Sequence, residues 1–190
     1  IRRPPRSTLS SSSAASDVYK RQEYFKLDYS KPIHLPNLMV APNGARPMKK
    51  DHPEVPMTIP EIVKTGQACY HSGADAIHFH IRNENGQHIL DSGLCKEALS
   101  ELHQKVPKMH LQITTEAVGK YSPPEMRKLA YEVLPPGISI AVREMIPSRK
   151  PELEDIKVYQ KLYEEGTKVQ HICYEPMDVS RTTIRDGIIL

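Results

Sequence analysis

Short apolar runs alternate with stretches of helical periodicity along most of this 190-residue chain. Five apolar runs predict β-strands over residues 35–42, 76–81, 109–115, 137–142 and 168–174. Between them, apolar positions three or four residues apart predict helices over residues 58–71, 93–106, 122–133 and 153–166. Regular alternation of strands and helices is typical of an α/β fold built on parallel strands.

Several of the predicted helices carry capping signals at their ends. Thr58 and Ser122 are each followed by an early proline and, three residues on, by a glutamate, which is the pattern of a capping box. Near the end of the chain, Asp178 is expected to cap a short helix that stops at Gly187.

The alternation alone fits two architectures, an open doubly wound sheet and a closed eight-stranded barrel. The chain stops on an apolar run, residues 188–190, that predicts the opening of a sixth strand. A (β/α)8 barrel takes about 250 residues. We therefore expect a (β/α)8 TIM barrel, truncated to about its first five βα units.

The first 22 residues differ in composition from the rest of the chain. They contain a serine run, five basic residues, one acidic residue and almost nothing apolar, which predicts disorder. A transit peptide has a similar composition, but the early prolines and the serines oppose the amphipathic helix it needs. The favoured interpretation is a non-native leader, a translated adapter sequence, which leaves residues 23–190 as the barrel domain.

Charge and cysteine content narrow the class of protein. The net charge of +3 comes from the leader, because residues 23–190 hold 21 basic and 22 acidic residues; nothing there indicates nucleic acid. No run approaches the roughly 20 apolar residues that cross a bilayer. Three cysteines far apart argue against a disulfide scaffold or a thiolate zinc site and favour a reducing, cytoplasmic location.

The second predicted strand carries the most unusual polar pattern. Alternation places His78, His80 and Arg82 on one face at its C-terminal end, where barrel enzymes place their sites. Strands of all-parallel sheets are usually apolar on both faces, so these side chains need an explanation. Two imidazoles two residues apart can bind one zinc ion. The alternative is that one ring bonds a backbone carbonyl and the other meets solvent.

Other strands also end in polar residues, which together could line one opening. Thr114, Thr115 and Glu116 end the third strand and are candidates for holding a polar substrate; solvent contact is the alternative explanation. In the fourth strand the corresponding polar members are Ser139 and Arg143, followed by Glu144. The fifth strand ends in Tyr174 and Glu175, and the first ends at the turn 43–46. Four further histidines are expected in loops or on the surface, without a role: His34, His52, His88 and His103.

The chain resembles the β-keto acid cleavage enzymes, whose type member cleaves 3-keto-5-aminohexanoate. The matching segments are residues 40–46 (VAPNGAR), 51–62, 72–91 (with HFHIR), 112–123, 139–145 and 170–179. The resemblance implies a zinc-dependent (β/α)8 barrel, usually a homo-oligomer. It also implies a reaction in which a β-keto acid and acetyl-CoA give acetoacetate and a new acyl-CoA.

The resemblance also implies residue roles. His78 and His80 match two zinc ligands, Thr114 matches a substrate-contacting serine, and Ser139 falls roughly at a substrate-contacting threonine. The family's third zinc ligand and its catalytic arginine and aspartate come from segments beyond residue 190. Arg46 replaces a glutamate of the type member, so an acidic or neutral substrate is expected, with Arg46 or Arg82 pairing with its carboxylate.

Two other interpretations stay open. Amidohydrolase-type metal barrels also use His-x-His on a strand, although normally on the first strand rather than the second. Alternatively, five βα units leave open sheet edges, so the chain alone could be an inactive fragment of such an enzyme.

Overall fold

A computed structural model describes residues 35–148 and 151–182 of the chain. In these residues five strands form one sheet, and every neighbouring pair is parallel. The strands are β1 (Met39–Val40), β2 (Ala76–His78), β3 (His110–Thr114), β4 (Gly137–Ala141) and β5 (Lys168–Ile172). Their spatial order is their order in the chain, β1-β2-β3-β4-β5. The described part therefore lacks the reversal of strand order that defines a doubly wound sheet.

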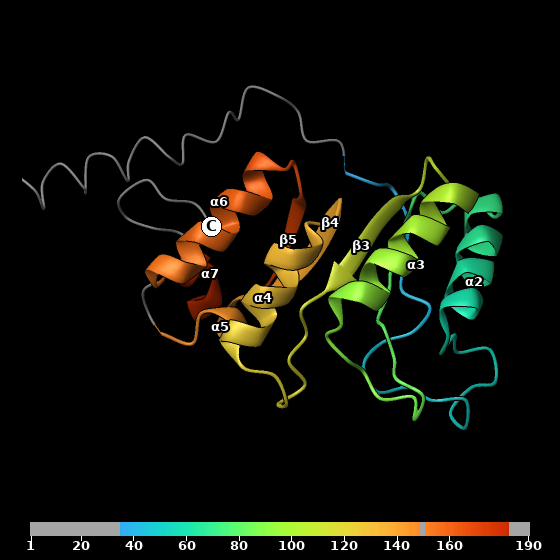
Figure 1. The fold of residues 1–190 in the computed structure, drawn as a ribbon, viewed down its shortest axis with the longest axis horizontal. Coiled ribbons are helices and arrows are strands. Elements are labelled where there is room, and N and C mark those ends of the chain that lie inside the picture. Colours follow the sequence, from blue (N-terminus) through green and yellow to red (C-terminus); the bar gives the residue numbers. More distant parts are fainter. Residues whose placement is uncertain (1–34, 149–150, 183–190) are drawn as a thin grey trace, which may run out of the picture.

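A helix follows each described strand, and the long helices cover one face of the sheet (Figure 1). They are α2 (Ile59–His71), α3 (Ser92–Lys105), α4 (Pro123–Val133), α5 (Val142–Met145), α6 (Leu153–Glu164) and α7 (Pro176–Thr182). The long helices contact one another in chain order: α2 packs on α3, α3 on α4, and α4 on α6. This α/β arrangement of sequential parallel strands is compatible with part of a (β/α)8 barrel.

Both predicted capping boxes are present. The hydroxyl of Thr58 accepts from the backbone N–H of Glu61, whose carboxylate accepts from the N–H of Thr58 at 3.2 Å. At the start of α4, the carboxylate of Glu125 accepts from the N–H of Ser122 at 2.8 Å. Each box satisfies backbone donors that a helix start leaves unpaired.

The two faces of the sheet differ in chemistry. Residues on the helix-covered face are buried in one hydrophobic cluster with helix side chains; they include Ile77, Leu111, Ile113, Ile138 and Ile140. Residues on the opposite face are mostly polar: His78, Gln112, Thr114, Ser139 and Gln170. The register pairs His78 with Gln112, Thr114 with Ser139, and Ser139 with Gln170. A continuous polar surface therefore crosses four strands.

Several strands are shorter than the sequence predicts. The second was expected over 76–81, but β2 ends at His78, since the N–H of His80 bonds the Asn43 side chain instead of a neighbouring strand. The fourth was expected to reach residue 142 with Arg143 as its next polar member, but β4 ends at Ala141 and Arg143 lies in α5.

Asp178 was expected to precede and cap the last helix, but α7 begins two residues earlier, at Pro176. Asp178 is the third residue of α7, fully buried, and its carboxylate accepts from Arg143 and from the N–H of Tyr174. The predicted leader (1–22), the helix end at Gly187 and the sixth strand (188–190) lie outside the described residues. Within the described ranges, no helix combines the length and apolar character needed to span a bilayer.

Candidate metal and substrate site

The two histidines of the second strand converge on one point. His78 ends β2, His80 follows two residues later, and their Nε2 atoms lie 3.1 Å apart. Two nitrogen ligands of a tetrahedral zinc ion, each at 2.0–2.1 Å, would be about 3.3 Å apart. Both Nε2 atoms are therefore placed as one ion would require.

The donor chemistry also suits a metal. Burial is the largest cause that lowers the pKa of His80, to about 2, and the nearby His78, His88 and Arg82 lower it further. Burial likewise lowers the pKa of His78, against hydrogen bonding to Gln112. Both rings are thus neutral near pH 7, the form that binds metal. Among the described residues, no group of three or more His, Cys, Asp or Glu side chains is placed to hold one metal ion, so a zinc ion on these two donors would need further ligands.

Asn43 fixes the backbone of His80. Its Oδ1 accepts from the His80 N–H at 3.0 Å, and its Nδ2 donates to the His80 carbonyl at 3.0 Å and to the Pro56 carbonyl at 3.1 Å. The sequence placed Asn43 in a turn and gave it no role of its own. The structure shows that this turn holds one of the two histidines.

His88 was expected to be a loop or surface residue without a role, but the structure places it, buried, beside His80. The centroids of these two rings are 4.9 Å apart, and Nε2 of His88 donates to the carbonyl of Glu116 at 3.0 Å. An antiparallel bridge between Arg82 and His88 brings it there. His52 and His103 are exposed as predicted, and His34 lies outside the described residues.

The guanidinium of Arg82 donates hydrogen bonds to backbone carbonyls. It donates to Gly44, to Pro47 at 3.1 Å and to Gly86 at 2.7 Å. Arg82 therefore joins the turn after β1 to the turn at Gly86. The side chain of Arg46 is 81% exposed and forms only a long ion pair with Glu116, at 3.8 Å, so its guanidinium is accessible to a substrate carboxylate.

Glu116 lies between a cation and a histidine. One of its oxygens is 3.8 Å from Arg46 and the other is 3.9 Å from Nδ1 of His80. The hydroxyl of Thr114 accepts from the N–H of Glu116 at 3.0 Å and so holds this turn in place.

Thr115 and Ser139 belong to the same strand ends but differ in their contacts. The Thr115 hydroxyl donates to the carbonyl of Ser139 at 3.2 Å and so ties β3 to β4. The Ser139 hydroxyl is buried and has no hydrogen-bond partner within the described structure. An unpaired buried hydroxyl on the polar face is available to a bound molecule.

A pocket of about 440 Å³ lies beside His88, whereas His78 and His80 are not among its lining residues. It is lined by Ala45, Arg46, Met48, Arg82, Gly86, Gln87, His88, Val118 and Lys120. Arg46 and Lys120 make its mouth cationic, which suits an anionic ligand.

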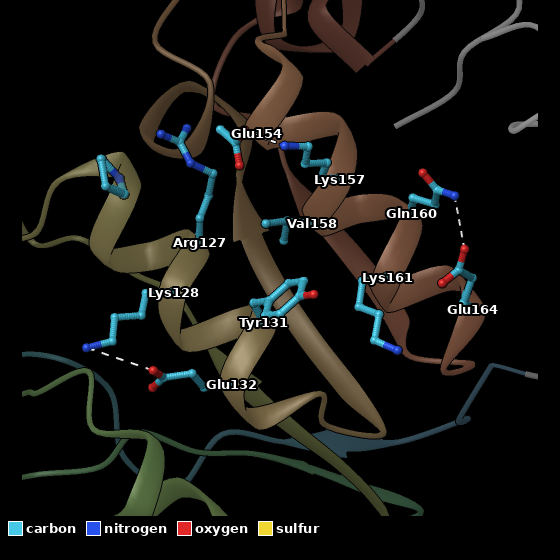
Figure 2. A pocket seen from close by; sticks show the side chains of 11 residues that line it. Arg127, Lys128, Tyr131, Glu132, Glu154, Lys157, Val158, Gln160, Lys161 and Glu164 are labelled. Carbon is cyan, nitrogen blue, oxygen red and sulfur yellow. Dashed lines mark hydrogen bonds and ion pairs between the residues drawn. The ribbon is translucent and has the colours of Figure 1, made fainter. Parts of the chain in front are cut away.

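A larger hollow lies between α4 and α6, on the helical face (Figure 2). Most of its charged side chains pair with neighbours, as in Lys128–Glu132 at 3.8 Å and Lys157–Glu154 at 2.8 Å. It is separated by the sheet from the polar face and contains no histidine or cysteine. We do not assign a reaction to it.

Known proteins provide an independent comparison. A 3-oxoadipate:acetyl-CoA acetyltransferase of Cupriavidus necator is 31% identical over 78 residues, 41% of this chain and 28% of that protein. A 3-keto-5-aminohexanoate cleavage enzyme of Fusobacterium nucleatum is 32% identical over 77 residues, 40% of this chain and 28% of that protein. The matched part therefore spans little more than a quarter of these curated relatives.

Among solved structures, a type I 3-dehydroquinate dehydratase of Clostridium difficile aligns with a TM-score of 0.48 and 16% identity, over 72% of this chain and 50% of that chain. A likeness at that level carries no argument. The family model for beta-keto acid cleavage enzymes, in contrast, matches residues 37–189. Since this match covers most of the chain, the chain belongs to the beta-keto acid cleavage enzyme family.

Proposed function

We propose that the full-length protein is a zinc-dependent acyltransferase. It would condense a β-keto acid with acetyl-CoA and split the product into acetoacetate and a new acyl-CoA. The observation that carries this proposal is the 3.1 Å convergence of the His78 and His80 Nε2 atoms in a chain of this family. The names of two relatives support the reaction class: one includes a β-keto acid and acetyl-CoA, and the other includes a β-keto acid.

We also propose that the five strands are part of a closed (β/α)8 barrel. Sequential strand order, helices on one face and a polar opposite face support it. In such a barrel the polar face would be the interior, and the turns after β1 to β5 would surround its opening.

The residues divide the chemistry between them. A zinc ion held by His78 and His80 would act as a Lewis acid for negative charge that develops on a ketone oxygen. Thr114 and Ser139 would bind the polar part of the substrate, and Thr115 would keep the two strand ends together. Glu116 would orient the Nδ1 side of His80 and the guanidinium of Arg46.

The charge around the pocket indicates the substrate class. Arg46 and Lys120 line the pocket, and the Arg46 guanidinium can pair with a carboxylate in bidentate geometry. We propose an acidic or neutral β-keto acid rather than an amino-substituted one. The full-length protein would act on these small molecules as a cytoplasmic homo-oligomer.

The test is an assay of zinc-loaded full-length protein with β-keto acids and acetyl-CoA. The proposal expects acetoacetate and a new acyl-CoA in equal amounts. Amide or lactone hydrolysis without acyl transfer would favour an amidohydrolase-type barrel and contradict it. The same assay on residues 1–190 alone tests whether this chain is an inactive part of the enzyme.

A further inference from the structure

A row of three side chains crosses the polar face from β2 to β5. Nδ1 of His78 lies 2.7 Å from Oε1 of Gln112, and Nε2 of Gln112 donates to Oε1 of Gln170 at 2.9 Å. We propose that Gln112 is a positioning residue that sets the tautomer and orientation of His78, with Gln170 fixing the Gln112 amide. This inference rests on the proposed function, because it assumes that His78 binds zinc.

The hydrogen bond between His78 and Gln112 determines which ring nitrogen of His78 keeps its lone pair. A carboxamide oxygen can only accept, so Nδ1 of His78 must carry the proton. Nε2 then keeps its lone pair, and it is Nε2 that converges with His80. The opposite tautomer would place a proton on Nε2 and block its binding to a metal.

The Gln112 amide has its oxygen toward His78 and its NH₂ toward Gln170. With its amide reversed, Gln112 would present NH₂ to Nδ1 and favour the wrong tautomer of His78. In the structure the oxygen of Gln170 accepts from the Gln112 NH₂, which leaves the Gln112 oxygen to His78. Gln112 is 6% exposed, so its amide depends on these two partners.

Gly137 leaves room for the row. It lies on β4, between Gln112 on β3 and Gln170 on β5. A Cβ at Gly137 would lie 2.8 Å from the carbonyl oxygen of Leu111 and 3.4 Å from Cβ of Gln112. Gly137 thus has no side chain that would crowd Gln112 on the polar face.

Of the two proposed zinc ligands, His78 has a side-chain partner at Nδ1 and His80 does not. Nδ1 of His80 has no partner within hydrogen-bond distance among the described residues, and Glu116 is 3.9 Å away. Outer partners of metal-bound histidines fix ring orientation, and losing one typically weakens metal binding about 10–100-fold. Gln112 is placed to provide that effect at His78.

The experiment compares full-length wild type with Gln112→Leu, Gln112→Glu and Gln170→Leu, and with Gln104→Leu on the exposed side of α3 as control. Zinc affinity is measured by competition with a chelator. The His78 tautomer is read from ring ¹⁵N shifts in metal-free protein.

We expect Gln112→Leu to weaken zinc binding about 10–100-fold and to lose the Nδ1–H tautomer of His78. Gln112→Glu keeps the acceptor and should restore wild-type affinity; Gln170→Leu should cause a smaller loss. Wild-type affinity in Gln112→Leu, or an equal loss in Gln112→Glu, would overturn the inference. A wild type that binds no zinc would instead defeat the proposed function, and the ¹⁵N shifts would still decide whether Gln112 sets the tautomer.

Discussion

The side chain of Asn43 bonds both backbone groups of His80, the N–H and the carbonyl, at 3.0 Å each. Asn43 is buried, and it follows β1, whereas His80 follows β2. One side-chain amide thus joins two neighbouring strand ends. It fixes the backbone of His80, from which the imidazole ring extends. The placement of the proposed ligand depends on a residue that cannot itself bind metal strongly.

Asn43→Ala should lower both stability and zinc affinity. The change leaves a buried N–H and a buried carbonyl of His80 without their partner, which typically costs about 1–3 kcal/mol. Urea unfolding and chelator competition measure the two effects. Asn85→Ala, in an exposed turn, is the matched control. An Asn43→Ala protein with the stability and zinc affinity of this control would contradict the assigned role.

The stability of the metal-free protein should fall as the pH is lowered from 6.5. Burial lowers the pKa of His78, His80 and His88, that of His80 to about 2. Below pH 6.5 the unfolded chain therefore takes up protons that the folded chain does not, which favours unfolding. The expected slope is at most about 1.4 kcal/mol per pH unit for each histidine.

Urea unfolding at pH 7, 6 and 5 measures this slope. His88→Gln keeps a donor for the Glu116 carbonyl but removes one titrating ring, so its slope should be shallower than that of wild type. A free energy of unfolding that stays constant from pH 7 to pH 5 would show that these rings are not buried as described.

Arg46→Gln should reduce activity on β-keto acids that carry a second carboxylate. A hydrogen bond to a charged group contributes about 1.5–3 kcal/mol, or roughly 10–100-fold in binding. The loss should appear mainly in KM, because the contact is made in substrate and transition state alike. Lys96→Gln, exposed on α3, controls for the loss of positive charge. Equal KM values for neutral and acidic substrates in wild type would contradict this role.

Gly137→Ala should destabilise the sheet. The new Cβ would lie 2.8 Å from a backbone oxygen of Leu111, which cannot move aside as a side chain could. Overpacking of this kind typically costs about 1–3 kcal/mol. Gly44→Ala should be close to neutral, because its Cβ would make only an ordinary contact with Pro47 at 3.5 Å. Thermal or urea unfolding compares the two; equal stability would contradict the tight contact at Gly137.

Much of the fold follows from local sequence. Periodicity predicts the four long helices within a residue or two, although it misses the short α5. The capping boxes at Thr58 and Ser122 form because they need only neighbours along the chain. Strand ends were predicted less well. β2 stops at His78 because the next free N–H, that of His80, bonds Asn43 from 37 residues away. No local pattern contains such a long-range competitor.

In the site, too, features set by local sequence could be predicted and features set by long-range contacts could not. Alternation along one strand predicts that His78 and His80 share a face, and the structure brings their rings together. His88 was missed because its place depends on the bridge to Arg82; the turn-forming residues 83–86 between them were the available signal. Gln112 could be placed on the polar face, but its pairing with His78 depends on a strand register that one sequence does not determine.

The central claim is that His78 and His80 bind one zinc ion, and metal content tests it most directly. Full-length protein, stripped with a chelator, reconstituted with zinc and desalted, should hold about one ion per chain. His78→Ala and His80→Ala should lose it, whereas His103→Ala, exposed on α3, should keep it. Undiminished zinc in His78→Ala, or none in the wild type, would contradict the account.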